Sequence, residues 1–152
     1  QIQMAKDLDI ILSMQPSFSY FWNGAGHEFA SVLGDSRADR LDPFKKVTDK
    51  GITVLSGSDC PVAPIQPLKY MAQCINGYNS SKNISVTDAI KMCTINPAYA
   101  NNEENIKGSL EIGKNADMVI IDKDPYKFAD SKEIFNTEVL RTIKCGITVY
   151  EK

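Results

Sequence analysis

Polar side chains follow two apolar segments at the points where strands of a parallel sheet would end. Gln15 closes the apolar segment 10–14, and Asp59 follows the apolar segment 52–57. In parallel α/β folds, the loops at the carboxyl ends of the strands hold the catalytic groups. A carboxylate in that place can ligate a metal ion or accept a proton from water. Asp59 can equally form a turn before Pro61 by bonding its own backbone, and the spacing alone favours this second interpretation.

Aromatic side chains cluster directly after the first apolar segment. Phe18, Tyr20, Phe21 and Trp22 follow one another too irregularly for a periodic pattern, and glycines come soon after them. We therefore predict a long loop there. Its rings either line a pocket for an apolar substrate or anchor the core beneath the loop.

Histidine and cysteine, the common zinc ligands, are few in this chain. The chain has 1 histidine, His27, which excludes a multi-histidine metal centre built by this chain alone. Its 4 cysteines form no C-x-x-C motif, so nothing supports a structural zinc site. We interpret Cys60, Cys74, Cys93 and Cys145 as reduced thiols of the core in a cytoplasmic protein.

Length, charge and hydropathy limit the classes of function. The 152 residues, with 43% hydrophobic and 24% charged side chains, are typical of a globular chain that buries its own core. The 17 Lys+Arg against 19 Asp+Glu give a net charge of −2, with no basic stripe for a nucleic acid. No apolar run approaches the roughly 20 residues of a membrane span. We expect no nucleic-acid partner, no membrane partner and no secretory signal.

The pattern of predicted elements changes near residue 103. Before it, the two apolar segments alternate with helices, which is typical of βα repeats in a parallel sheet. After it, strands predominate. We therefore divide the chain into an α/β part, 1–103, and a mostly β part, 104–152. The helices are predicted at 1–9, 29–33, 43–50 (Asp42 as N-cap), 67–76, 86–93 (Ser85 as N-cap) and 96–100, with one at 131–135; the later strands are predicted at 108–110, 116–122 and 139–150, with a hairpin turn at Cys145-Gly146.

Five stretches in the same order resemble the amidohydrolase superfamily. They are SMQPSF at 13–18, GSDCPV at 57–62, AIK with TINPAYA between 89 and 100, GSLEIGKNAD at 108–117, and VL, TI and G between 139 and 146. They are most similar to the subgroup that contains N-substituted formamide deformylases. The resemblance implies a (β/α)8 barrel with one or two divalent metal ions at the carboxyl ends of its strands. A small β-sandwich formed by both chain termini would pack beside the barrel.

The resemblance also implies where this chain belongs in that fold. Segments 10–14 and 52–57 would be strands seven and eight, so the chain would hold the last two βα units of a partial (β/α)8 barrel. The residues from 108 onward would be C-terminal strands of the β-sandwich. The family's histidine ligands have no counterpart, and a barrel needs roughly 250 residues. We therefore expect a C-terminal fragment, inactive by itself and without a tightly bound metal ion.

Asp59 matches the aspartate that ends strand eight in the family. The resemblance makes it a metal ligand and the catalytic acid and base, and places Gln15, Phe18 and Trp22 at the substrate. The implied activity is metal-dependent hydrolysis of a C–N bond in an amide or N-substituted formamide, with zinc the expected metal in the intact enzyme. The expected partners are a small amide, the N-terminal part of the same protein, and further copies of the chain at open sheet edges.

Two other functions remain open. One is a non-catalytic α/β binding or scaffold module that uses the aromatic segment as a groove, with Asp59 only forming a turn. The other is a catalytically dead homologue that has kept the amidohydrolase fold.

Overall fold

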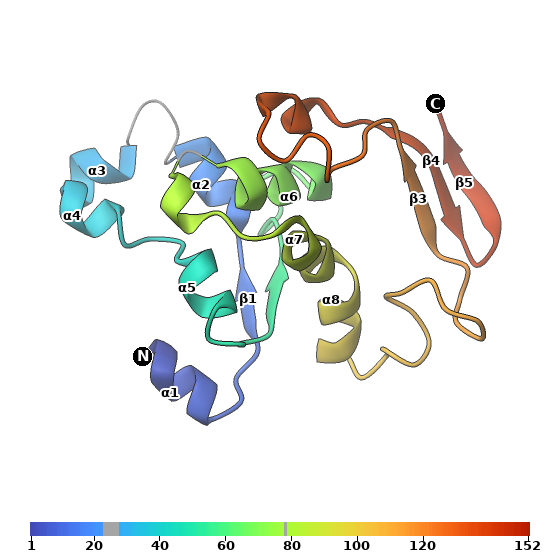
Figure 1. The fold of residues 1–152 in the computed structure, drawn as a ribbon, viewed down its shortest axis with the longest axis horizontal. Helices are drawn as coiled ribbons and strands as arrows, with labels where there is room; N and C mark the ends of the chain where they lie inside the picture. The colour runs from blue at the N-terminus through green and yellow to red at the C-terminus, as the bar shows by residue number, and fades with distance from the viewer. Residues whose placement is uncertain (23–27, 78) are drawn as a thin grey trace.

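Two separate sheets organise a mixed α/β chain. The computed structural model describes residues 1–22, 28–77 and 79–152. Strands β1 (Leu12–Met14) and β2 (Val54–Ser56) pair in parallel, whereas β3 (Met118–Ile121), β4 (Val139–Lys144) and β5 (Ile147–Glu151) form an antiparallel sheet in that order. Figure 1 shows the antiparallel sheet beyond α7 and α8, away from β1 and β2. The helices are α1 (Ile2–Asp7), α2 (Pro16–Trp22), α3 (Glu28–Leu33), α4 (Asp35–Ala38), α5 (Phe44–Thr48), α6 (Pro67–Asn76), α7 (Val86–Cys93) and α8 (Ile95–Ala100), with 3-10 turns η1 (Ser80–Lys82) and η2 (Lys132–Asn136).

The parallel pair brings the ends of two distant segments to one edge. Leu12 lies opposite Val54 and Met14 opposite Ser56, which confirms the predicted parallel pairing. Because parallel strands end at the same edge of a sheet, Gln15 and the loop after β2 leave on the same side. There α2 packs against α6, as Figure 1 shows above the strands.

The core lies around β2, between helix α5, which precedes it, and the helices that follow it. Val54 and Ala72 are almost completely buried, and Met92 is 1% exposed. The C-terminal part joins this core through Ile134 of η2, and Lys69 of α6 donates a hydrogen bond to the carbonyl of Phe135. These contacts fix η2 on α6. The buried cluster comprises Phe44, Val47, Ile52, Val54, Ala72, Cys74, Ile75, Ile84, Val86, Ala89, Met92 and Ile134.

The helices predicted from apolar periodicity and capping are confirmed. α6 has the predicted bounds, Pro67–Asn76, with a proline in its first turn. α7 begins after Ser85, whose hydroxyl accepts the Asp88 N–H at 3.0 Å and donates to the Asp88 carboxylate at 2.6 Å. The first bond is an N-cap, in which a side chain satisfies an N–H that the first turn leaves free, and the second joins the two side chains.

The loop predicted for the aromatic stretch is wrong in the part that the structure describes. Residues 16–22 form helix α2, which begins at Pro16, where the missing proline N–H costs no helical bond. The rings of this helix contact different neighbours, so the aromatic residues form no single apolar stripe. The sequence pattern therefore does not predict the helix. Tyr20 stacks on Phe135 of η2, and Phe18 contacts Trp22 within the helix.

Asp42 does not cap α5, contrary to the prediction. Pro43 occupies the N-cap position, and no side chain accepts a hydrogen bond from that end of the helix. Asp42 has φ +49 and instead accepts a hydrogen bond from the Ser19 hydroxyl of α2. This partner is far away in sequence, so local capping rules could not predict it.

Two further predictions are wrong. Residues 108–110 form no strand, and Gly108 (φ +96) instead passes so close to α8 that a Cβ would lie 2.8 Å from the Ala98 Cβ. The four cysteines are free, but only Cys74 is buried, whereas Cys60 and Cys145 are exposed. Both exposed cysteines lie in turns, where the chain faces solvent. Across the described ranges, no helix has the length and apolar character required to cross a membrane.

Candidate functional site

Asp59 stands in a tight turn directly beyond β2. Its φ is +56, in the left-handed region, and its carbonyl accepts the Val62 N–H at 2.8 Å. The preceding Ser58 is buried, and its hydroxyl accepts the Cys60 N–H at 3.1 Å, which fixes the loop. The turn predicted as the alternative role of Asp59 therefore exists in the backbone. The Asp59 carboxylate is exposed and makes no hydrogen bond to any described residue, so it is available to other groups.

Gln15, Phe18 and Trp22 lie at the same strand edge, beyond β1. Gln15 joins β1 to α2, and the rings of Phe18 and Trp22 meet edge to face with centroids 5.0 Å apart. All three are partly buried. The parallel pairing thus places Gln15, which begins the segment leading into α2, and the loop that carries Asp59 at the same edge of one sheet, from segments that are far apart in sequence.

Phe135 is a further aromatic residue near this edge that sequence inspection missed. Its ring stacks on Tyr20 of α2, with centroids 5.6 Å apart and planes inclined by 23°. Tyr20 and Phe21 remain partly exposed, at 38% and 44%. Only the return of the C-terminal segment onto α6 brings Phe135 here, and no local motif signals it.

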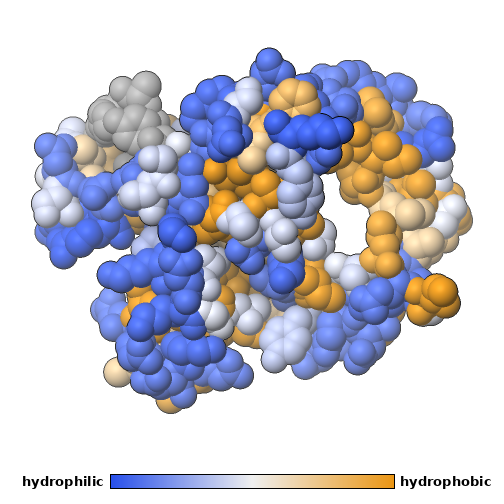
Figure 2. Space-filling view, viewed as in Figure 1, coloured by the Kyte–Doolittle hydropathy of each residue, from blue (hydrophilic) through white to orange (hydrophobic). Residues whose placement is uncertain are grey.

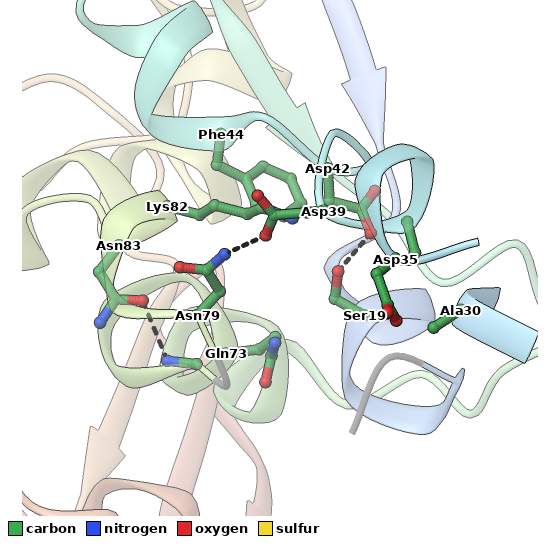
Figure 3. A pocket seen from close by; sticks show the side chains of 12 residues that line it. Ser19, Ala30, Asp35, Asp39, Asp42, Phe44, Gln73, Asn79, Lys82 and Asn83 are labelled. Carbon is green, nitrogen blue, oxygen red and sulfur yellow. Dashed lines mark hydrogen bonds between the residues drawn. The ribbon is translucent and has the colours of Figure 1, made fainter. Parts of the chain in front are cut away.

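A pocket of about 310 Å³ lies beside α2, on the side of α4 and α5. Figure 3 shows Asp35, Asp39 and Asp42 around it, with Ser19 bonded to Asp42 and Asn79 bonded to Asp39. None of Asp59, Gln15, Phe18 and Trp22 lines it, so this pocket and the predicted site are different places. The lining residues are Ser19, Ala30, Asp35, Ala38, Asp39, Asp42, Phe44, Gln73, Gly77, Asn79, Lys82 and Asn83.

Asp42 is a carboxyl group of this pocket whose pKa is changed by its surroundings. Burial raises its pKa above the ordinary value of 3.8, because a charged carboxylate is less well solvated there. The Ser19 hydrogen bond and the positive charge of Lys82 act in the opposite direction and offset part of this effect. The Lys82 ammonium itself donates to the Leu41 carbonyl at 2.8 Å.

The donor groups present do not make a metal site on their own. Across residues 1–22, 28–77 and 79–152, no three His, Cys, Asp or Glu side chains gather closely enough to hold a metal ion. A catalytic zinc ion takes three protein ligands, whereas the strand edge offers the one carboxylate of Asp59. His27, the single histidine, lies outside the described residues.

Comparison with known proteins places this arrangement in a family. Over its whole length the chain is 31% identical to the N-substituted formamide deformylase of Arthrobacter pascens, and over 99% of its length 30% identical to the protein YtcJ of Bacillus subtilis (strain 168). It spans 29% and 30% of the lengths of these two relatives.

A solved structure has a similar fold. The crystal structure of A. niger ochratoxinase matches 99% of this chain and 34% of its own, with a TM-score of 0.69 at 19% identity. A model of the amidohydrolase family matches residues 1–150. With this match and these relatives, the chain belongs to the amidohydrolase family.

Proposed function

We propose that this chain supplies one edge of a hydrolase active site that cleaves a C–N bond in an amide or N-substituted formamide. In this proposal β1 and β2 are the last two strands of a (β/α)8 barrel, and the residues after 103 belong to a β-sandwich beside it. The single observation that carries the proposal is the place of Asp59. It is an exposed carboxylate that no described residue bonds, at the carboxyl end of a parallel strand, in a chain of the amidohydrolase family.

The proposed role of Asp59 is proton transfer. Hydrolysis of an N-substituted formamide adds water to the carbonyl carbon, breaks the C–N bond, and yields formate and an amine. Asp59 would accept a proton from the attacking water and return it to the departing nitrogen, as an acid and base catalyst must. The exposed Asp59 carboxylate, which no described residue bonds, and the backbone turn that holds it support this role, because a general base must be able to reach the water that it deprotonates.

The aromatic rings of α2 would hold the substituent of the substrate. Phe18 and Trp22 present an edge-to-face pair, and such rings bury apolar groups well. Gln15, at the end of β1, would bond the amide through its own side-chain amide. We propose small amides with apolar substituents as the substrate class.

Further groups must complete this site. We propose that a divalent metal ion, with zinc the expected one, is held by imidazoles from polypeptide outside residues 1–152. The relatives are more than three times longer than the matched segment, which supports such a contribution. Residues 1–152 alone would then be inactive and would retain no stoichiometric zinc.

Replacement of Asp59 by Asn in the complete gene product tests the proposal. Formanilide is a suitable probe, because its hydrolysis releases aniline and formate in measurable amounts. Loss of a general acid and base lowers kcat by about 100- to 10,000-fold. Asp49→Asn, on the exposed end of α5, is the matched control and should leave kcat unchanged. A scaffold or a catalytically dead homologue would show no turnover to lose, and wild-type turnover in the Asp59→Asn protein would refute the assigned role.

A further inference from the structure

The edge of β2 that faces away from β1 is held by side chains of the α7–α8 corner. Thr53 accepts the Leu12 N–H and Gly57 donates to the Met14 carbonyl, both at 2.9 Å, so these residues point toward β1. Because the backbone N–H and C=O groups of successive residues point to opposite sides of a strand, those of Val54 and Ser56 point to the edge away from β1. No strand within the described residues pairs there.

Asn96 occupies this edge. Its side-chain amide donates to the Val54 carbonyl at 2.7 Å, a short and therefore well-formed hydrogen bond between segments 42 residues apart. Val54 is 1% exposed, so its carbonyl has little access to water. Loss of the Asn96 donor would leave a buried acceptor unsatisfied, which the strand could relieve only by shifting.

Ser56 makes a second contact with the same corner, through its side chain and not through its backbone. Its hydroxyl lies 3.1 Å from the Cys93 sulfur and 3.4 Å from the Met92 carbonyl, at the end of α7. Burial raises the pKa of the Cys93 thiol, which keeps it protonated and able to share this bond. β2 is therefore bound to the α7–α8 corner twice, through the Val54 carbonyl and through the Ser56 hydroxyl.

We propose that Asn96 is a positioning residue for Asp59, acting through β2 with Ser56 as its second contact. Asp59 lies three residues beyond the last residue of β2, in a turn that its own backbone makes rigid. A shift of the short strand would therefore displace the Asp59 carboxylate by a similar distance. This inference rests on the proposed function, since it assigns the position of the group that transfers the proton.

Two Asn96 variants of the complete gene product separate positioning from packing. Asn96→Ala removes the amide, and Asn96→Asp keeps its shape but brings no N–H donor to Val54. Misplacement of a reacting group by about 1 Å costs up to about 100-fold in rate. We expect kcat on formanilide, per folded enzyme, to fall by about 10- to 100-fold in both variants, with KM changed less than about twofold.

Asn101→Ala, at the exposed end of α8, is the matched control and should keep the wild-type kcat. A loss of thermal stability with unchanged kcat would show that Asn96 only stabilises the fold, and would overturn the inference. A fully active Asn96→Asp protein would also overturn it.

If neither Asn96 variant folds, Ser56→Ala provides the same test from the strand, because it removes one hydroxyl and leaves the Asn96 bond. A lower kcat at unchanged KM supports positioning, and an unchanged kcat contradicts it. Asp59→Asn is measured alongside. If Asp59→Asn retains activity, the proposed function fails; if Asp59→Asn loses activity and the corner variants do not, this inference alone fails.

Discussion

Among single residues, Asp42 shows most directly how the fold changes the chemistry of a side chain. It joins α2 to the segment before α5 through Ser19, and burial raises its pKa. In the unfolded chain the carboxyl group titrates at its ordinary value of 3.8. Between these two pKa values the folded state binds more protons than the unfolded state. The free energy of unfolding therefore falls as pH rises through this window, and the loss persists above it.

Replacement of Asp42 by Asn should remove this pH dependence. The amide keeps an acceptor for the Ser19 hydroxyl, and asparagine tolerates the left-handed backbone at this position. The stability of the variant relative to wild type should rise between pH 3.5 and pH 7, chosen as roughly bracketing the window. Urea denaturation at a series of pH values measures it. The non-titrating Asn101→Ala should give a curve parallel to wild type, and a parallel Asp42→Asn curve would contradict the prediction.

Sequence inspection succeeds for single residues where one local rule decides. Asp59 could be placed beyond a buried strand because an apolar run followed by Gly57 and Ser58 marks a strand end. The roles of Asn96 and Asp42 could not be predicted, because their partners Val54 and Ser19 are brought to them only by the fold.

At the scale of elements, helix α7 shows how local chemistry sets a boundary. Ser85→Ala removes the N-cap bond and the bond to the Asp88 carboxylate, and should lower the free energy of unfolding by about 1 kcal/mol. Denaturant titration measures the change. Ser80→Ala is a suitable control, because Ser80 is exposed and its hydroxyl bonds no described residue. Equal stability of the two variants would show that the cap contributes nothing.

Elements were predictable from the sequence where periodicity and a cap agree, as in α6 and α7. The hairpin turn at Cys145-Gly146 was predictable for a similar reason, and both residues have positive φ there, which such turns require. Helix α2 and the irregular segment 108–110 were not predictable. Their conformations depend on contacts with η2 and α8, which a short window of sequence does not contain.

For the whole molecule, the antiparallel sheet leaves an apolar face exposed. Register places Val119, Leu140, Ile147 and Tyr150 on one face, and between 39% and 70% of each is exposed. Figure 2 shows hydrophobic surface gathered on the right, where β3–β5 lie in Figure 1, with an opening between this region and the helices. Thr142 and Lys144 lie on the same face, so the surface is mixed but rich in apolar side chains, which is typical of a surface that another polypeptide covers.

We predict that residues 1–152 expressed alone associate through this face. Ile147 is 70% exposed, and Ile147→Lys would place a charge in the centre of any contact. Light scattering should show a lower average mass for this variant, approaching that of the monomer. Val32→Lys, on the exposed surface of α3, should leave the mass of the assembly unchanged. A monomeric wild-type chain would disprove the association.

The backbone of Asp59 also affects how substitutions at the strand edge must be interpreted. At φ +56, aspartate and asparagine are accommodated far more readily than residues without a short polar side chain. An alanine scan would therefore combine two penalties at this position, the missing carboxylate and a distorted main chain. A library screened for folded protein should consequently recover asparagine and glycine at this position and should lose valine and isoleucine, whereas a screen for turnover should recover aspartate.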